Sequence, residues 1–161
     1  MSGELHPFVL HFAVGLLLIA PLCDALGLLL RRETLLFAGR WSTIFGTVAG
    51  LLALVTGLGA EASLGPHSAA GDALLHVHGT LGYVMVAVWV PVAAWRALSK
   101  LALPLRARTI YLAGAFTGAA LVLAETMLGT TLVYRHGVGL SAAARAEPLI
   151  RPVAPPTIEK R

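Results

Sequence analysis

The sequence predicts an all-α integral membrane protein, a four-helix bundle with both chain ends on the outer, periplasmic side of a bacterial inner membrane. Three observations predict this fold class. Hydrophobic residues make up 57% of the 161 residues and charged residues only 12%, whereas soluble domains carry about 25% charged residues. The apolar residues form four runs of about 20–25 residues, the length that crosses a bilayer. The basic residues gather at the ends of these runs.

The four apolar runs are expected to span the membrane within a domain of residues 1–137. The predicted spans are about 7–30, 41–60, 74–95 and 109–134. The first run is too long for the core of a signal peptide and follows Glu4 rather than a positive cluster, so it is expected to stay as an anchor. The second run carries a stripe of small residues from Gly46 to Gly57, which allows close approach of helices in lipid.

The positions of the basic residues predict the orientation. Apart from those at and after the end of the fourth span, which should influence orientation less, they lie between the first two spans and between the last two. These residues are Arg31, Arg32, Arg40, Arg96, Lys100, Arg106 and Arg108. The connection between the second and third spans holds Glu61 and Asp72 but no Lys or Arg. Because cytoplasmic loops carry the positive charge, both basic loops are predicted inside and both chain ends outside. Residues 138–161 are polar and rich in proline, and we expect an extended tail there.

Composition also narrows the function. The net charge of +4 comes from clusters at helix ends, not from a basic surface interleaved with aromatic residues, so nucleic acid is not expected as a partner. A single cysteine, Cys23, excludes an intrachain disulfide. The chain lacks a Walker loop, a dinucleotide fingerprint, a GxSxG motif and a CxxCH motif. The sequence therefore favours an electron-transfer or accessory subunit over a self-contained enzyme.

All six histidines fall at or just below the predicted outer surface. They are His6, His11, His67, His76, His78 and His136. Ionisable groups at membrane depth are costly and usually functional. His11 has Gly15 one turn deeper, and His78 has Gly82. A histidine with glycine at i+4 suits haem, because the imidazole binds iron while the missing side chain admits the porphyrin edge. Both histidines lie about 6 Å below their predicted helix starts. They are therefore predicted to ligate the iron of haem b.

The other ionisable residues leave alternatives open. His6 and His136 either cap helix ends or ligate a second haem or hold its propionates, and His67 and His76 are expected at the surface. Glu125, near mid-membrane, either relays protons, contacts a quinone headgroup or is a protonated carboxyl bonded to a neighbouring group. Asp24 is predicted to pair with one of the arginines that follow it. These are Arg31, Arg32 and Arg40.

Three segments resemble a known family. They are LHPFVLHF at residues 5–12, HVHGTLG at 76–82 and LVYRHGVG at 132–139. Together they are similar to the bacterial family catalogued as domain of unknown function 2231, small four-helix membrane proteins, over roughly residues 5–140. The family usually has proline soon after the second opening histidine, where this chain has Ala13. The resemblance implies the fold and supplies no activity.

Three functions follow from these residues. The first is a b-type cytochrome that carries electrons between the quinone pool and an outer-face redox partner, as a subunit of a larger complex with other membrane or periplasmic redox subunits. The second is a cofactor-free accessory or anchor subunit. The third is a periplasm-facing protein that binds Zn or Cu with three or four imidazoles, ligands that suit both ions.

Overall fold

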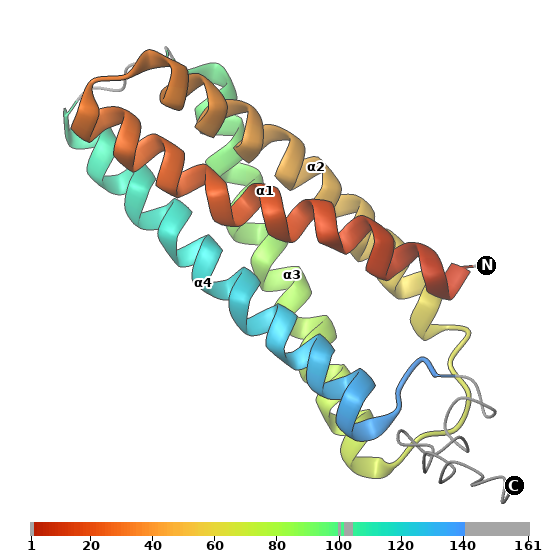
Figure 1. The fold of residues 1–161 in the computed structure, drawn as a ribbon. Coiled ribbons are helices and arrows are strands. Elements are labelled where there is room, and N and C mark those ends of the chain that lie inside the picture. The colour runs from red at the N-terminus through yellow and green to blue at the C-terminus, as the bar shows by residue number, and fades with distance from the viewer. Residues whose placement is uncertain (1, 100, 102–104, 141–161) are drawn as a thin grey trace, which may run out of the picture.

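The fold is a bundle of four long α-helices (Figure 1). The structure is a computed structural model and describes residues 2–99, 101 and 105–140. The helices are α1 (Ser2–Leu30), α2 (Glu33–Glu61), α3 (Ala69–Leu98) and α4 (Leu105–His136). Each contains a stretch of 26–30 residues that is long and apolar enough to cross a membrane, and the mean hydropathy of an 18-residue window within it ranges from 1.5 to 2.3. The prediction of an all-α fold with four membrane-crossing helices is confirmed.

The helices extend beyond the predicted spans, which lie inside them. Apolar runs mark only the part of a helix in hydrocarbon, while backbone hydrogen bonding continues into the headgroup region. The predicted tail starts with a turn, because Gly137 has a positive φ of 63° and Val138 donates to the carbonyl of Leu132 at 3.0 Å. The rest of the predicted tail, residues 141–161, lies outside the described residues.

Successive helices run antiparallel and pack as neighbours around the bundle, with α4 closing against α1. In the described part of the chain α1 makes no close backbone contact with α3, so these two helices face each other diagonally across the interior. Buried positions recur every three and four residues. On α2 they include Leu36, Gly39, Thr43, Gly46, Gly50 and Ala53. This 3.5-residue repeat is typical of left-handed packing with a crossing angle of about 20°.

Glycines set the register between α1 and α2. A Cβ added at Gly46 would lie 2.7 Å from Leu17 Cδ2, and one at Gly39 would lie 2.5 Å from Asp24 Oδ1. These contacts require glycine, since real Cβ atoms are not found so close to neighbouring atoms. The small-residue stripe of the second span therefore lies against α1. Close approach of this kind is how helices associate in lipid, where no hydrophobic force drives them together.

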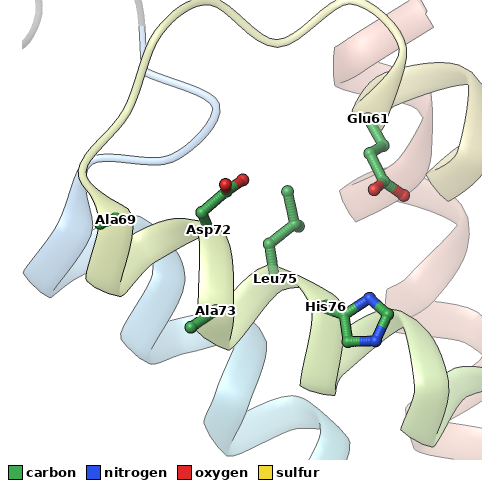
Figure 2. A pocket seen from close by; sticks show the side chains of 6 residues that line it. All are labelled: Glu61, Ala69, Asp72, Ala73, Leu75 and His76. Carbon is green, nitrogen blue, oxygen red and sulfur yellow. The ribbon is translucent and has the colours of Figure 1, made fainter.

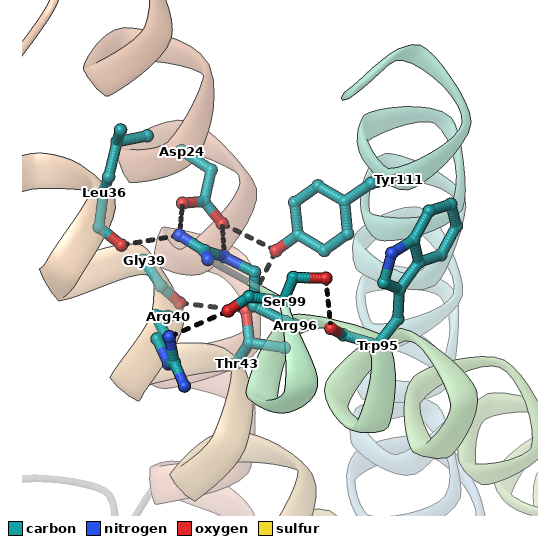
Figure 3. A network of polar contacts seen from close by, with 9 residues as sticks. All are labelled: Asp24, Leu36, Gly39, Arg40, Thr43, Trp95, Arg96, Ser99 and Tyr111. Carbon is teal, nitrogen blue, oxygen red and sulfur yellow. Dashed lines mark hydrogen bonds and ion pairs between the residues drawn. The ribbon is translucent and has the colours of Figure 1, made fainter. Parts of the chain in front are cut away.

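A buried polar network ties all four helices together at one end of the bundle (Figure 3). Arg96 on α3 donates to Asp24 on α1 at 3.0 Å and to the carbonyl of Leu36 on α2 at 2.8 Å. Tyr111 on α4 donates to the same carboxylate at 2.6 Å. Asp24 and Arg96 are both only 1% exposed. This end, which also holds the Arg31–Arg32 turn, is named the arginine end, and the opposite end, with His6 and loop 62–68, is named the histidine end.

The predicted partner of Asp24 was wrong. Asp24 pairs with Arg96 across the bundle, not with Arg31, Arg32 or Arg40. Arg40 instead donates to the carbonyls of Ala97 and Ser99, at 2.6 and 3.1 Å, at the end of α3. A cation is favourable at this position, because the last carbonyls of a helix have no partner within it.

The two polar ends are separated by an apolar middle. His6 and Asp24 are eighteen residues apart on α1, which corresponds to about 27 Å of helix. The hydrocarbon core of a bilayer is about 30 Å thick. The main buried cluster lies between these levels. It consists of Leu17, Met85, Trp89, Val92, Tyr111, Ala115, Ala119 and Val122. The buried charges therefore lie toward the two ends of the bundle, and the main buried cluster lies between them.

Replacement of Arg96 tests the network. Arg96→Met leaves the Asp24 carboxylate buried without its counter-ion, so we expect the free energy of unfolding to fall by about 3–5 kcal/mol. The double variant Asp24→Leu/Arg96→Met removes both charges and is expected to recover most of this loss. Denaturant unfolding in mild detergent measures both. The control is Arg32→Met, which removes an exposed arginine; an equal loss there would show that burial of the pair does not matter.

Candidate histidine–glutamate site

Three ionisable side chains meet inside the histidine end. They are His6 on α1, His78 on α3 and Glu125 on α4, and they are named the histidine–glutamate site. His78 Nδ1 lies 3.1 Å from Glu125 Oε1. His6 lies at the same end of the bundle, with its ring against Gly57 of α2. Glu125 is 6% exposed, and both imidazoles are half-buried. The site therefore joins three helices, two of them diagonal to each other.

Each side chain of the site lies against a glycine of a neighbouring helix. A Cβ at Gly57 would lie 3.0 Å from His6 Cε1, and one at Gly129 would lie 3.4 Å from His78 Cε1. Likewise a Cβ at Gly82 would lie 3.4 Å from Glu125 Oε1. Gly82, predicted to admit a porphyrin edge beside His78, thus faces the carboxylate.

The ring nitrogens are oriented in the same way in both histidines. His6 Nδ1 lies 2.8 Å from the carbonyl oxygen of Ala53. A carbonyl only accepts hydrogen bonds, so Nδ1 carries the proton and Nε2 keeps its lone pair. His78 likewise turns Nδ1 toward an acceptor, the carboxylate of Glu125. Among the described residues no hydrogen-bond partner meets Nε2 of either ring. His6 Nε2 therefore keeps a free lone pair, and Nε2 of His78 also meets no hydrogen-bond partner among the described residues.

Two buried atoms of the site lack a hydrogen bond within the described part of the chain. They are His78 Nδ1 and Glu125 Oε2. His78 Nδ1 is within bonding distance of Oε1, but the alignment of the two groups does not form a hydrogen bond. Buried polar atoms without a partner cost free energy and call for an explanation, such as a bound ion, water or ligand. The site is thus polar and incompletely satisfied.

His11 lies outside the site. Its ring is exposed, its Nδ1 bonds to the carbonyl of Pro7, and it points away from the buried face of α1 that carries Ala13 and Leu17. Gly15, one turn deeper, is exposed and has no atom within 4 Å of a Cβ position. The structure therefore turns His6 inward, against Gly57 and the carbonyl of Ala53, and leaves His11 on the exposed face.

The remaining histidines have separate surroundings. His136 ends α4 and packs on the start of α3. A Cβ added at Gly71 would lie 3.4 Å from the Cβ of His136. His67 ties loop 62–68 to α3, with Nε2 3.0 Å from Asp72 Oδ1. His76 is exposed. In residues 2–99, 101 and 105–140 no group of three or more His, Cys, Asp or Glu side chains is placed to hold a metal ion.

A notch opens beside the site, between the end of α2 and the first turns of α3 (Figure 2). Its volume is about 580 Å³. The lining residues are Glu61, Ala69, Asp72, Ala73, Leu75 and His76. In Figure 1 the α1–α2 and α3–α4 pairs diverge toward this end. The notch is thus the concave surface beside the histidine–glutamate site.

Four apolar helices of membrane-spanning length around a buried polar site define a small multi-span membrane protein. Residues 3–142 match the family model described as "Predicted membrane protein (DUF2231)", and the chain belongs to this family. The resemblance seen in the sequence is therefore confirmed. No curated protein and no solved structure matches the chain.

Sequence reasoning found the members of the site but paired them differently. A signal for the observed arrangement was present. His78 has a glycine four residues later, and so does Glu125. When two antiparallel helices pack, such pairs interlock, so that each polar residue lies against the glycine of the other helix. This reciprocal pattern predicts the contact of His78 with Glu125.

Two glycines of α2 give a matched test of the packing around His6. Gly57→Ala places a methyl group about 3.0 Å from the His6 ring. The ring must move, and we expect the free energy of unfolding to fall by about 1–3 kcal/mol. Gly59→Ala, two residues away, meets nothing within 4 Å and should change it by less than about 0.5 kcal/mol. Thermal unfolding in detergent compares the two, and equal effects would contradict the placement of His6.

Proposed function

We propose that the chain is a b-type haem protein that transfers electrons between a quinone pool and a redox partner at the outer face of a bacterial inner membrane, as a subunit of a larger complex. The observation that carries the proposal is the pair His6 and His78. Each turns Nδ1 to an acceptor of the protein and leaves Nε2 free.

This arrangement is typical of histidines that ligate a metal. Such a histidine donates its other ring N–H to a carbonyl or carboxylate, which fixes the tautomer and raises the basicity of the ligating nitrogen. The carbonyl of Ala53 has this place for His6. Glu125 Oε1, 3.1 Å from His78 Nδ1 but not aligned for a hydrogen bond, is the carboxylate that would take it for His78. In helical bundles, cofactors are held between facing helices in the interior, and α1 and α3 face each other in this way. Bound haem supplies a one-electron couple, tuned by the axial ligands and their hydrogen bonds.

The charge distribution supports an outward histidine end. Basic residues lie at the arginine end of the helices, and they include Arg31, Arg32, Arg40 and Arg96. No Lys or Arg occurs between Arg40 and Arg96, the stretch that contains the loop of the histidine end. The positive-inside rule then places the arginine end in the cytoplasm and both chain ends outside.

Glu125 has two roles in this proposal. Its Oε1 positions the His78 ring, and its buried Oε2, which lacks a hydrogen bond among the described residues, can accept one from a quinol hydroxyl. A carboxylate at membrane depth is typical of sites that handle protons or polar ligands.

A cofactor-free subunit is the second candidate. It is favoured by the close packing of the three site side chains against Gly57, Gly82 and Gly129, which fills the space beside these glycines with protein atoms. In that case the imidazoles and the carboxylate stabilise the bundle itself. Zn or Cu, the third candidate, is separated from haem by metal analysis of protein prepared without chelator.

Histidine variants and a visible spectrum test the haem proposal. Protein purified from haem-sufficient cells is expected to show a reduced-minus-oxidised band in the haem α region. His6→Ala and His78→Ala should each abolish it, because each removes an imidazole that would hold the haem iron. His11→Ala, on the exposed face of the same helix, should retain it.

A colourless and iron-free preparation would end the haem proposal. Loss of the band in the His11 variant but not in the His6 variant would restore His11 as the ligand. Size-exclusion chromatography of each variant establishes that the bundle has folded, so that loss of the band reports on ligation.

Replacement of Glu125 tests its position beside His78. Glu125→Gln keeps the size of the side chain and removes a negative charge near the iron, so the reduced state gains relative stability. We expect the midpoint potential to rise by tens of millivolts while the haem band remains. A potentiometric titration measures the shift. Glu33→Gln removes the same charge at the arginine end and should leave the midpoint potential unchanged. Equal midpoint potentials in the unaltered chain and both variants would contradict the placement of Glu125 beside the haem.

A further inference from the structure

We propose that the notch at the histidine end is the docking surface for a soluble redox protein whose contact face is rich in Lys and Arg. This inference rests on the proposed function and names the partner of that site. Its basis is the position of the notch, the charge of its walls and the mixture of apolar and acidic residues that lines it.

The notch opens at the same end of the bundle as the histidine–glutamate site, between the end of α2 and the first turns of α3. Glu61 is four residues beyond Gly57, the glycine that contacts His6. His76, on the opposite wall, is two residues before His78. Four residues of helix correspond to about 6 Å. A protein seated in the notch is therefore close to the histidine–glutamate site, as transfer of an electron requires.

The charged walls of the notch are acidic. Glu61 is exposed, and the Asp72 side chain is 75% exposed even with His67 Nε2 3.0 Å from one oxygen. Residues 41–95 contain no Lys or Arg. In the described part of the chain Arg135 and His136 are basic residues of this end, but they belong to α4 and do not line the notch. Such a surface attracts a basic partner and speeds its approach.

The lining also has the composition of a protein interface. Leu75 lies between the carboxylates of Asp72 and Glu61, and Ala69 and Ala73 add apolar surface beside Asp72 (Figure 2). An apolar centre with a charged rim is the usual anatomy of such contacts, and small interfaces are typical of transient redox complexes. A bare cation fits less well, since the described residues hold no group of three ligands for a metal ion.

The test uses the full chain in nanodiscs of phosphatidylcholine, a lipid without net charge, and cytochrome c as the basic redox probe. Biolayer interferometry measures the affinity at low and at physiological ionic strength. We expect saturable binding that weakens with salt. Glu61→Gln/Asp72→Asn should lower the affinity about fivefold to tenfold at low salt, as expected for two charge contacts. Glu33→Gln is the matched control, because it removes a carboxylate from the opposite end, and it should bind as the unaltered chain does.

Each outcome decides the proposal. The proposal is overturned if the affinity for cytochrome c does not depend on ionic strength. It is also overturned if Glu61→Gln/Asp72→Asn leaves that affinity unchanged. Binding that appears only after truncation behind Leu140 would assign the notch to the basic residues of the chain's own tail, Arg145, Arg151, Lys160 and Arg161, and would also overturn it. Binding by a haem-free preparation supports the docking surface and removes only the haem proposal. A preparation that holds haem but does not bind cytochrome c overturns only the docking proposal.

Discussion

A polar group buried in a bilayer has no water to bond, so the bundle must satisfy it from within. The protein meets this constraint by gathering its buried charges into two layers near the ends of the helices. At the arginine end Asp24 accepts from Arg96 and Tyr111, and all four helices contribute. At the histidine end the contacts are fewer, and His78 Nδ1 and Glu125 Oε2 lack hydrogen bonds within the described residues. Arg96 Nη1 at the arginine end also lacks a hydrogen bond within the described residues. The layers differ instead in connectivity, since the first bonds all four helices together and the second has fewer contacts.

The two layers are linked through the packing of the helices. Gly39 lies against Asp24 and Gly46 against Leu17, so the register of α1 on α2 is set near the arginine end and at mid-membrane. In the same register His6 meets Gly57 and the carbonyl of Ala53. A shift of one helical turn would place bulky side chains at the glycine contacts and remove His6 from His78. The position of the candidate ligands thus depends on small residues far from them.

The sequence predicted the four helices because length and hydropathy are local properties of a segment. It did not predict which face of each helix points inward. In lipid the outer face is as apolar as the core, so apolar periodicity does not distinguish the two. His6 and His11 illustrate this, since both are polar residues near the same membrane level, and only packing against Gly57 identifies His6 as the inward one. Asp24 was paired with arginines nearby in the sequence, whereas Arg96 reaches it from a diagonal helix. The contacts of the glycines, rather than apolar periodicity, therefore indicate which face of each helix points inward.

The apolar middle also bears on the chemistry that the site supports. Between the two layers the main buried cluster consists of side chains such as Leu17, Met85 and Val122. Thr47 is buried there, but its hydroxyl donates to the carbonyl of Thr43 within its own helix. Proton transfer across the whole bundle needs a chain of bonded polar groups, and in the described part of the chain these groups do not join the layers. Electron transfer needs only proximity. Exchange of electrons with a partner at the histidine end, as we propose, needs no such chain through the bundle.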